Sequence, residues 1–471
     1  MRNGRSMRVD TQAALEAKAL TTLGQLKAGL LVGIRRLDLS CGLIEFPREI
    51  FDLADSLEIL NLSGNGLTSL PHDLPRLHKL SILFCSNNLF TELPKVLGQC
   101  KKLTMVGFKA NQISRVPDEA LVPTLRWLIL TDNRIQNLPS SIGQCQQMQK
   151  LMLAGNQLSE LPVELAGCSN LELLRLSANR FNVLPSWILT MPNLAWLAIA
   201  VNPMTDGFEA TRKAPLIASV DWRQLELGAQ LGEGASGVIY QAKMQQTNLS
   251  SVEVAVKVFK SAVTSDGMPR SEMAASIAVG LHPHVVGVLG KIKHHPESAQ
   301  GLVMPLISAD YTNLAQPPSL DSCTRDVYPK NTAFSLSQLC EIANSVSSAA
   351  AHLHACGVLH GDLYAHNILR NVAGHSFLGD FGAASFLPMK DAVTSLALQR
   401  IEVRAFGIFL DELLAHCREL EGDTHQAVRA KLAELHQKCT QTKVSARPLL
   451  ADVVRELSAL QHHIEVTSSI S

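Results

Sequence analysis

The sequence has no stretch of about 18 uninterrupted apolar residues, the length that a membrane-spanning helix requires. It also has no excess of charge, because 42 lysines and arginines balance 42 aspartates and glutamates. We therefore expect no membrane span, and the balanced charge gives no electrostatic footprint for nucleic acid or for an anionic membrane surface.

The ten cysteines show no paired spacing typical of zinc ligands, so reduced and mostly buried thiols are expected. Residues 1–15 carry positive charge but no apolar core of signal-peptide length. Together these absences favour a cytoplasmic protein. What the chain does have is length and apolar material: 471 residues, of which 46% are hydrophobic, predict two or three domains with well-packed cores.

The first half of the chain is a repeat. Its most regular mark is an asparagine that recurs at steps of 23 residues, with one step of 22, at Asn65, Asn88, Asn111, Asn133, Asn156, Asn179 and Asn202. Each asparagine lies in the frame LxxLxLxxNxLxxLP, complete from Leu57 to Pro71. Alternate leucines of a short strand would point into the core, and the asparagine would satisfy backbone groups where the chain turns. This frame identifies leucine-rich repeats.

The strand positions of the concave repeat surface carry unusually large apolar residues. A free solenoid would leave these positions solvated, and exposed apolar patches mark interaction surfaces. We expect this face to bind a protein partner or the C-terminal half of the chain; the alternative is that its side chains only cover one another. The apolar members are Phe84, Trp127, Ile129, Met152 and Trp196, and Arg175 shares the face.

The repeats are predicted to span residues 34–205. Residues 1–33 are expected to form a helical cap over the first repeat, which is one residue short and has Cys41 near the asparagine position. The frame ends after Asn202, and residues 206–220, with Gly207 and Pro215, read as a short linker. A second folded domain is expected over residues 221–460, followed by a flexible tail over residues 461–471.

The second domain opens with a glycine-rich stretch, LGEGASGVIY, from Leu231 to Tyr240. Its Gly232, Gly234, Gly237 and Val238 match the pattern GxGxxGxV. Glycines let backbone amides approach phosphate oxygens closely, and the flanking residues favour a strand-turn-strand lid. Taken alone, this pattern is a weak signal.

Three further segments extend the nucleotide site. Lys257 ends the strand-like VAVK and could reach phosphate oxygens, while Glu272, on a helical stretch, could pair with it. The apolar stretch that includes Met304 and Leu306 could offer backbone hydrogen bonds to an adenine. Residues 312–335 lack periodicity and are predicted to be a loop, and a helix is predicted from Leu336 to Ala355.

The stretch VLHGDLYAHNIL, Val358 to Leu369, carries the chemistry of phosphoryl transfer. Asp362 could accept the proton of an attacking hydroxyl, and Asn367 could hold a magnesium ion. Asp380, in the sequence Asp-Phe-Gly, adds a second magnesium ligand.

These segments, taken in order, resemble a eukaryotic-type protein kinase domain, and the whole chain resembles a leucine-rich repeat protein kinase. The resemblance implies an α/β leucine-rich repeat solenoid followed by a bilobal α+β protein-kinase-like domain, with ATP and Mg²⁺ as cofactors. It implies an enzyme that phosphorylates protein hydroxyls, serine or threonine in preference to tyrosine. The repeats would serve as an interaction or regulatory module, and the sequence leaves the oligomeric state open.

The catalytic loop departs from the family pattern. Gly361 replaces the usual arginine, Tyr364 the lysine of serine/threonine kinases, and His366 the arginine that tyrosine kinases often carry. His366 could instead place partial positive charge near the transferred phosphate; the alternative is a neutral hydrogen-bonding or packing role.

The peptide-binding platform is also in doubt. No APE motif follows Asp380, Glu402 stands where the family has an aspartate that supports the catalytic loop, and Arg447 lacks its usual glutamate partner. The alternative function is a nucleotide-binding pseudokinase scaffold with little or no transfer.

Overall fold

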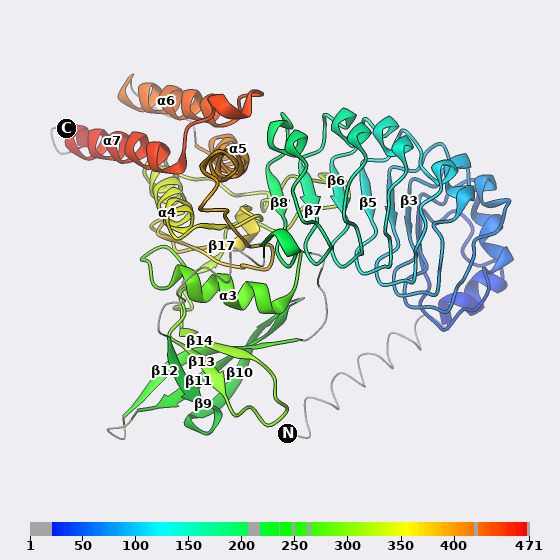
Figure 1. The fold of residues 1–471 in the computed structure, drawn as a ribbon, viewed down its shortest axis with the longest axis horizontal. Coiled ribbons are helices and arrows are strands. Elements are labelled where there is room, and N and C mark those ends of the chain that lie inside the picture. Colours follow the sequence, from blue (N-terminus) through cyan, green and yellow to red (C-terminus); the bar gives the residue numbers. More distant parts are fainter. Residues whose placement is uncertain are drawn as a thin grey trace. The chain divides into compact units, whose positions relative to one another are not determined.

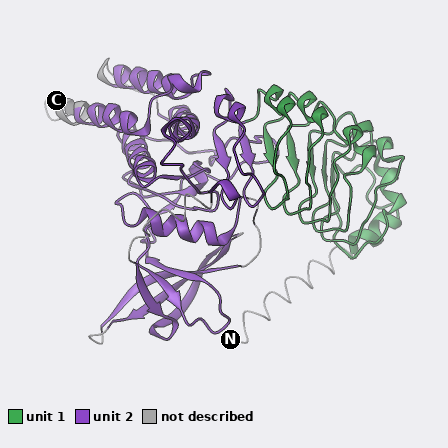
Figure 2. Ribbon diagram, viewed as in Figure 1, with its two compact units in different colours: residues 1–171 green, residues 172–471 purple. Residues whose placement is uncertain are grey.

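The computed structural model describes residues 21–205, 217–234, 236–246, 250–260, 264, 266–418 and 423–468. The chain divides into two compact units, residues 1–171 and residues 172–471 (Figure 2). Within the described residues, no helix is both long and apolar enough to cross a membrane. Residues 1–20 of the predicted cap and residues 206–216 of the predicted linker lie outside the described residues, and residues 21–27 are helical.

The described part of the first unit contains six three-residue strands that pair in parallel, each one repeat from the next (Figure 1). They are β1 (Arg36–Asp38), β2 (Ile59–Asn61), β3 (Ile82–Phe84), β4 (Met105–Gly107), β5 (Trp127–Ile129) and β6 (Lys150–Met152). A 3-10 helix follows each strand: η1 (Arg48–Leu53), η2 (Leu74–Arg76), η3 (Lys95–Gln99), η4 (Asp118–Ala120), η5 (Ser140–Gln144) and η6 (Val163–Gly167).

The repeat asparagines join neighbouring turns, as the sequence predicts. Asn88 Nδ2 donates to the carbonyl oxygens of Leu62 and Cys85 at 2.9 and 3.1 Å, and its Oδ1 accepts from the Leu67 amide at 2.9 Å. The middle strand leucines, such as Leu60 and Leu83, are fully buried. One side chain therefore satisfies backbone groups of two repeats, which explains why an asparagine recurs at each turn.

The large apolar residues of the first unit partly cover one another. Trp127 Nε1 donates to Met152 Sδ at 3.3 Å, and the Lys150 ammonium lies 4.7 Å from the Trp127 ring centroid. Phe84 fills the space left by Gly107, where a Cβ would come within 2.6 Å of its ring. Phe84, Trp127 and Ile129 stay half-buried, and binding of a partner by this face stays a prediction.

The second unit contains the last two repeat strands, β7 (Leu173–Arg175) and β8 (Trp196–Ala198), paired in parallel, with η7 (Ser186–Thr190) between them. A six-stranded sheet follows, in the order β10-β11-β12-β14-β13-β9. Its strands are β9 (Ala218–Asp221), β10 (Leu225–Glu233), β11 (Gly237–Gln245), β12 (Ser251–Phe259), β13 (Gly290–Lys293) and β14 (Gly301–Pro305). Strand β9 thus begins inside the predicted linker, and it pairs in parallel with β13.

The helices of the second unit are α3 (Pro269–Val279), α4 (Leu336–Ala355), α5 (Ala392–Ala415), α6 (Asp423–Cys439) and α7 (Leu450–Ser468), with 3-10 helices η8 (Trp222–Gln224), η9 (Ala365–Asn367) and η10 (Val444–Ala446). Helix α4 has the predicted bounds, because Ser335 and Gln338 form a capping box at its start. Helix α7 extends through residues 461–468, inside the predicted tail.

Two small sheets lie among these helices. One contains β15 (Thr312–Asn313), β17 (Ile368–Arg370) and β18 (Ser376–Leu378), and the other contains β16 (Val358–Leu359) and β19 (Ser385–Phe386). The segment 312–335, predicted to be a loop, contributes β15 and two isolated bridges, one between Gln316 and Val327 and one between Phe334 and Cys417. The architecture predicted from the sequence is confirmed: leucine-rich repeat strands, then a sheet lobe and a helical lobe (Figure 1).

Candidate functional site

The glycine-rich stretch forms the turn between β10 and β11. The Gly234 amide donates to the Gly237 carbonyl at 2.9 Å, which closes the turn. A Cβ at Gly232 or Gly234 would meet no atom within 4 Å, whereas one at Gly237 would come within 2.6 Å of the Val258 carbonyl oxygen. Val238 is buried in the sheet. The turn is therefore open on the side where backbone amides could approach a ligand.

Lys257 of β12 and Glu272 of α3 form an ion pair. Their side chains are 13% and 4% exposed, so the pair is largely shielded from solvent. Because breaking a buried pair leaves an uncompensated charge, Glu272 fixes where the lysine ammonium lies.

Two adjoining cavities meet at Lys257. One, of about 180 Å³, is lined by residues that include Gly234, Gly237, Asp266 and Asp380. The other, of about 270 Å³, is lined by Met304, Leu302, Glu272, His366, Asn367 and Asp380 among others. The cavities share Ile239, Lys257 and Asp380. The Leu306 side chain packs against the cluster that contains Met304, Met273 and Leu302, and the backbone hydrogen bonds of this segment to an adenine stay a prediction.

The catalytic loop holds Asp362 and Asn367 against each other. Asn367 Nδ2 donates to Asp362 Oδ2 at 2.8 Å and to the Asp362 carbonyl at 2.9 Å. The Asp362 amide lies 3.2 Å from His360 Nδ1, and His360 Nε2 lies 2.8 Å from the Gly379 carbonyl. These contacts define the ring as the tautomer that donates from Nε2 and accepts at Nδ1, and they tie Asp362 to the segment that carries Asp380.

A guanidinium from the repeats reaches the same carboxylate. Arg175 of β7 donates from Nη2 to Asp362 Oδ1, from Nη1 to the Gly361 carbonyl at 2.8 Å, and from Nε to Asp266 Oδ1 at 2.8 Å. Burial alone would raise the pKa of Asp362, but the Arg175 guanidinium, with the His366 ring, holds it below its ordinary value.

Gly361 fits a place that other residues cannot take. Its φ is +72°, and a Cβ there would lie 2.6 Å from the Ala383 carbonyl oxygen and 2.9 Å from the Leu197 carbonyl oxygen. Its amide donates to Glu402 Oε1 at 2.6 Å, and Glu402 Oε2 lies 2.7 Å from His354 Nε2. Glu402 therefore supports the catalytic loop from α5.

Tyr364 stacks on a repeat tryptophan. The ring centroids of Trp196 and Tyr364 are 4.2 Å apart with their planes at 7°, and Trp196 Nε1 donates to the Leu363 carbonyl at 3.0 Å. Both residues are buried, at 1% and 4% exposure. Trp196 of the predicted concave face thus contacts the catalytic loop.

His366 contacts a carboxylate from the long loop before α4. Its Nδ1 lies 2.7 Å from Asp326 Oδ1, and its amide donates to Asp326 Oδ2 at 3.0 Å. Burial alone would lower the pKa of His366, but Asp326 and Asp362 raise it above its ordinary value. The ring therefore carries more positive charge near neutral pH than a free histidine would.

The segment after Asp380 is short, and a repeat strand contacts it. Only eleven residues separate Asp380 from the start of α5 at Ala392. Within them, Ser385 of β19 is buried and its Oγ accepts from the Ile199 amide at 3.0 Å. The last repeat therefore contacts the segment after Asp380, the segment in which the sequence lacks an APE motif.

Arg447 is buried without a carboxylate partner. Its guanidinium donates to the carbonyl oxygens of Gln441, Arg400 and Pro192 at 2.8, 3.1 and 2.6 Å. Burial and the nearby Arg404 lower its pKa to about 10. Backbone carbonyls thus take the place of the missing glutamate.

Sequence reasoning missed three residues of the site: Arg175 as a contact of Asp362, and the carboxylates Asp266 and Asp326. The repeat frame places Arg175 on the concave face, but it gives no sign of which residue lies opposite. Asp266 and Asp326 lie in segments without periodicity, so no sequence pattern marks them.

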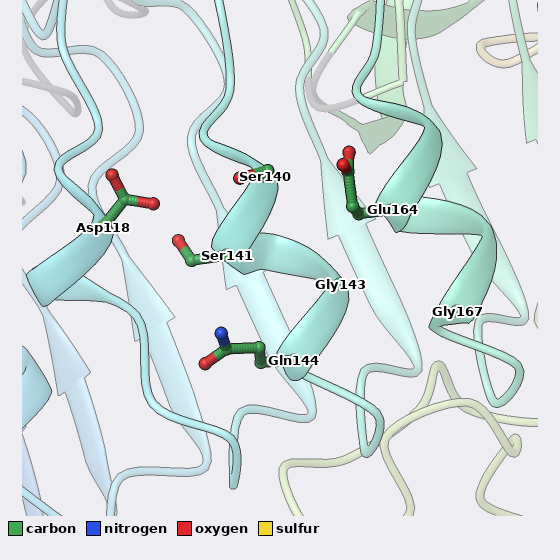
Figure 3. A pocket seen from close by; sticks show the side chains of 7 residues that line it. All are labelled: Asp118, Ser140, Ser141, Gly143, Gln144, Glu164 and Gly167. Carbon is green, nitrogen blue, oxygen red and sulfur yellow. The ribbon is translucent and has the colours of Figure 1, made fainter.

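A further hollow, of about 550 Å³, lies in the first unit among η4, η5 and η6 (Figure 3). Its lining contains the carboxylates Asp118 and Glu164 but no lysine or arginine, so it does not suit a phosphate group. The residues that line it are Asp118, Ser140, Ser141, Gly143, Gln144, Glu164 and Gly167.

Comparisons with known proteins agree with the geometry. Residues 225–408 match a family model described as protein tyrosine and serine/threonine kinase. Residues 123–181 and 56–77 match two leucine rich repeat models. A leucine-rich repeat protein of Leptospira interrogans is 35% identical, with a TM-score of 0.36, over 38% of this chain and 45% of that one. A TM-score that low does not establish a common fold.

Three curated kinases share a segment with this chain. CBL-interacting protein kinase 22 of Oryza sativa subsp. japonica is 32% identical over 34% of this chain and 36% of its own length. Cyclin-dependent kinase 11.1 of Caenorhabditis elegans is 27% identical over 33% of this chain and 20% of its own length. Serine/threonine-protein kinase PITSLRE of Drosophila melanogaster is 28% identical over 33% of this chain and 15% of its own length. The chain spans about a third or less of the length of these relatives.

Proposed function

Because the chain joins leucine-rich repeats to a protein kinase domain, we propose that it is an ATP-dependent protein kinase. The observation that carries the proposal is the meeting of Lys257, Glu272, Asn367 and Asp380 around two adjoining cavities, with Asp362 bonded to Asn367. These side chains come from separate segments, and each has a part in phosphoryl transfer.

Lys257, held by Glu272, binds the α- and β-phosphates of ATP, while the turn of Gly232, Gly234, Gly237 and Val238 covers them. The strand that carries Met304 supports the adenine. Backbone groups of Met304 and Leu306 bind the adenine, and the Leu306 side chain packs beside Met304.

The oxygen atoms of Asn367 and Asp380 suit a hard divalent cation, and both residues line the 270 Å³ cavity. When bound there, Mg²⁺ neutralises phosphate charge. Asp362 accepts the proton of the attacking hydroxyl, with its carboxylate oriented by Asn367. The His366 ring lines the same cavity and adds positive charge near the transferred phosphate.

The acceptor is a protein hydroxyl, serine or threonine in preference to tyrosine. Several similar kinases are named serine/threonine kinases, and a tyrosine-protein kinase receptor is among them as well. The repeats serve as the interaction module, with Phe84, Trp127, Ile129 and Met152 as the partner-binding face. We assign the protein to the cytoplasm, since the structure gives its described cysteines no disulfide bond.

Transfer of radiolabelled phosphate from ATP tests the proposal, with the purified chain and casein as acceptors. Wild type should incorporate label in the presence of Mg²⁺, and Asp362→Asn should lose it by a factor of about 10² to 10⁴ while still binding ATP. Lys257→Met should weaken ATP binding, whereas Lys243→Met, an exposed lysine on the neighbouring strand β11, should not.

Equal labelling by wild type and Asp362→Asn would overturn the assignment of the base. Binding of ATP without any transfer by wild type would identify a nucleotide-binding scaffold instead.

A further inference from the structure

We propose that Arg175, carried by the repeat strand β7, is a positioning residue of the phosphotransfer site that holds the base Asp362 in place. The inference rests on the proposed function. It makes the last two repeats a permanent part of the catalytic machinery and not a detachable module.

The contacts of Arg175 join three segments that are distant in sequence. Its guanidinium contacts the Asp362 carboxylate, the Gly361 carbonyl and the Asp266 carboxylate, which lies between β12 and α3. The planar fork of donors on an arginine suits such a set of acceptors, because each bond fixes the direction of the others. With Asn367 on the second oxygen, the Asp362 carboxylate is held from two sides.

The exposed fractions of the Arg175 and Asp362 side chains indicate that Arg175 does not block access to the base. Arg175 is 1% exposed, while Asp362 keeps 17% of its side chain exposed. A carboxylate offers about four acceptor sites, so bonds from Arg175 and Asn367 leave room for a substrate hydroxyl. The guanidinium thus approaches from the protein side and leaves the open side of Asp362 accessible.

Further contacts join β8 and the residue after it to the same segments of the site. Trp196 donates to the Leu363 carbonyl, and the Ile199 amide donates to Ser385 Oγ. The Leu197 carbonyl leaves room only for a glycine at position 361. Separating these surfaces would expose the Trp196 ring and leave several buried polar groups without hydrogen-bond partners, which would cost free energy.

The local charges explain why a cation is needed. Asp266 and Asp380 line one cavity, and Asp362 interacts with both Asp266 and Arg175. Lys257 is already paired with Glu272, so Arg175 is the cation that bridges Asp266 and Asp362. Without it, two partly buried carboxylates would repel each other and the loop would lose its fixed position.

The test compares Arg175→Met and Arg175→Lys with Arg180→Met, which removes an exposed arginine from the same repeat. Three quantities are measured on the full chain: kcat for phosphate transfer, ATP affinity, and hydrogen exchange of residues 358–369. Arg175→Met should lower kcat about 100-fold and remove protection of the Gly361 and Asp362 amides. It should weaken ATP affinity by a smaller factor, because Asp266, which it leaves without its cation, lines the cavity at Lys257. For Arg175→Lys, kcat and exchange protection should lie between those of wild type and those of Arg175→Met. Arg180→Met should match wild type in both.

In an Asp362→Asn background, Arg175→Met should cause no further loss of kcat. A higher kcat in Arg175→Met would identify an inhibitory plug and overturn the proposal, as would unchanged kcat and unchanged exchange. If Arg175→Met does not fold, a folded Arg175→Lys with wild-type kcat and exchange would overturn it. A wild-type chain without any transfer overturns the proposed function itself, and this inference with it.

Discussion

The indole of Trp196 and the phenol of Tyr364 lie face to face, with ring centroids 4.2 Å apart and planes at 7°. Trp196 also donates to the carbonyl of Leu363 in the catalytic loop, 167 residues away in the sequence. A repeat side chain and a catalytic-loop side chain thus form one buried aromatic pair. Stacked pairs of this kind contribute about 0.5–1.5 kcal/mol beyond the burial of their area.

Replacing Trp196 with alanine should destabilise the chain by about 3–5 kcal/mol, because it empties a fully buried site and leaves the Leu363 carbonyl without its donor. Urea unfolding followed by fluorescence would measure the loss. Trp187→Ala, at a half-buried position of the preceding repeat, should cost clearly less. Equal losses would show that the stacking is not a strong contact.

Replacing Gly361 with alanine should impair both stability and transfer, since the new Cβ would meet two carbonyl oxygens and the residue would keep a positive φ. Gly280 provides the matched control, because its φ is +68° and a Cβ there would meet nothing within 4 Å. Gly280→Ala should cost about 1–3 kcal/mol from backbone strain alone and should leave kcat unchanged. Gly361→Ala should cost more and lower kcat, which thermal melts and transfer assays would show. Similar effects of the two variants would contradict the close contact.

Replacing Glu402 with glutamine should destabilise the chain by about 1–3 kcal/mol, because an amide cannot accept on both sides from the Gly361 amide and His354. Burial alone would raise the pKa of Glu402, but His354 and the Gly361 amide lower it, which marks the group as an ionised acceptor. Chemical denaturation would measure the change. Glu434→Gln, on the surface of α6, should have almost no effect; a similarly small effect at Glu402 would argue against its supporting role.

Stability should fall as the pH is lowered from about 6.5 to about 4. Burial, with the neighbouring rings of His352 and His284, lowers the pKa of His282 to about 4 in the folded chain. The unfolded chain therefore binds more protons in this window, so stability rises with pH across it. Because the ring is only half-buried, the loss should be about 1–2 kcal/mol, less than the full shift implies.

Denaturation curves at pH 7 and pH 4.5 would measure this change in stability. His282→Gln should flatten the dependence, while His462→Gln, at an exposed position, should leave it as in wild type. A dependence equally steep in His282→Gln would assign the titration to another group.

The repeat strands, the kinase architecture and the bounds of α4 could be predicted from the sequence, because each has a periodic or local signal. The leucine frame requires an asparagine at every turn, and Ser335 with Gln338 marks a helix start. Likewise Lys257, Glu272, Asn367 and Asp380 could be predicted because they occur in a fixed order. Glu402 was placed behind the catalytic loop, where its carboxylate accepts from Gly361.

The partners of the catalytic loop could not be predicted, because they depend on how distant segments pack. Arg175 and Asp362 lie 187 residues apart, and a repeat pattern gives the face of a side chain but not the surface opposite to it. The residues at 361 and 364 appeared only as departures from a family pattern. The structure gives both a physical reason, since Gly361 makes room for the Leu197 carbonyl and Tyr364 stacks on Trp196.

The contact between Arg175 and the Gly361 carbonyl joins residues that the ribosome adds at different times. The ribosome makes Arg175 before it makes Gly361, 186 residues later, a delay of roughly 10 to 40 seconds at typical elongation rates. A repeat folds in far less time than that. Strands β7 and β8 are therefore ready as a template when the catalytic loop emerges. A chain translated without them would leave the carbonyls of Gly361 and Leu363 without the donors that Arg175 and Trp196 supply.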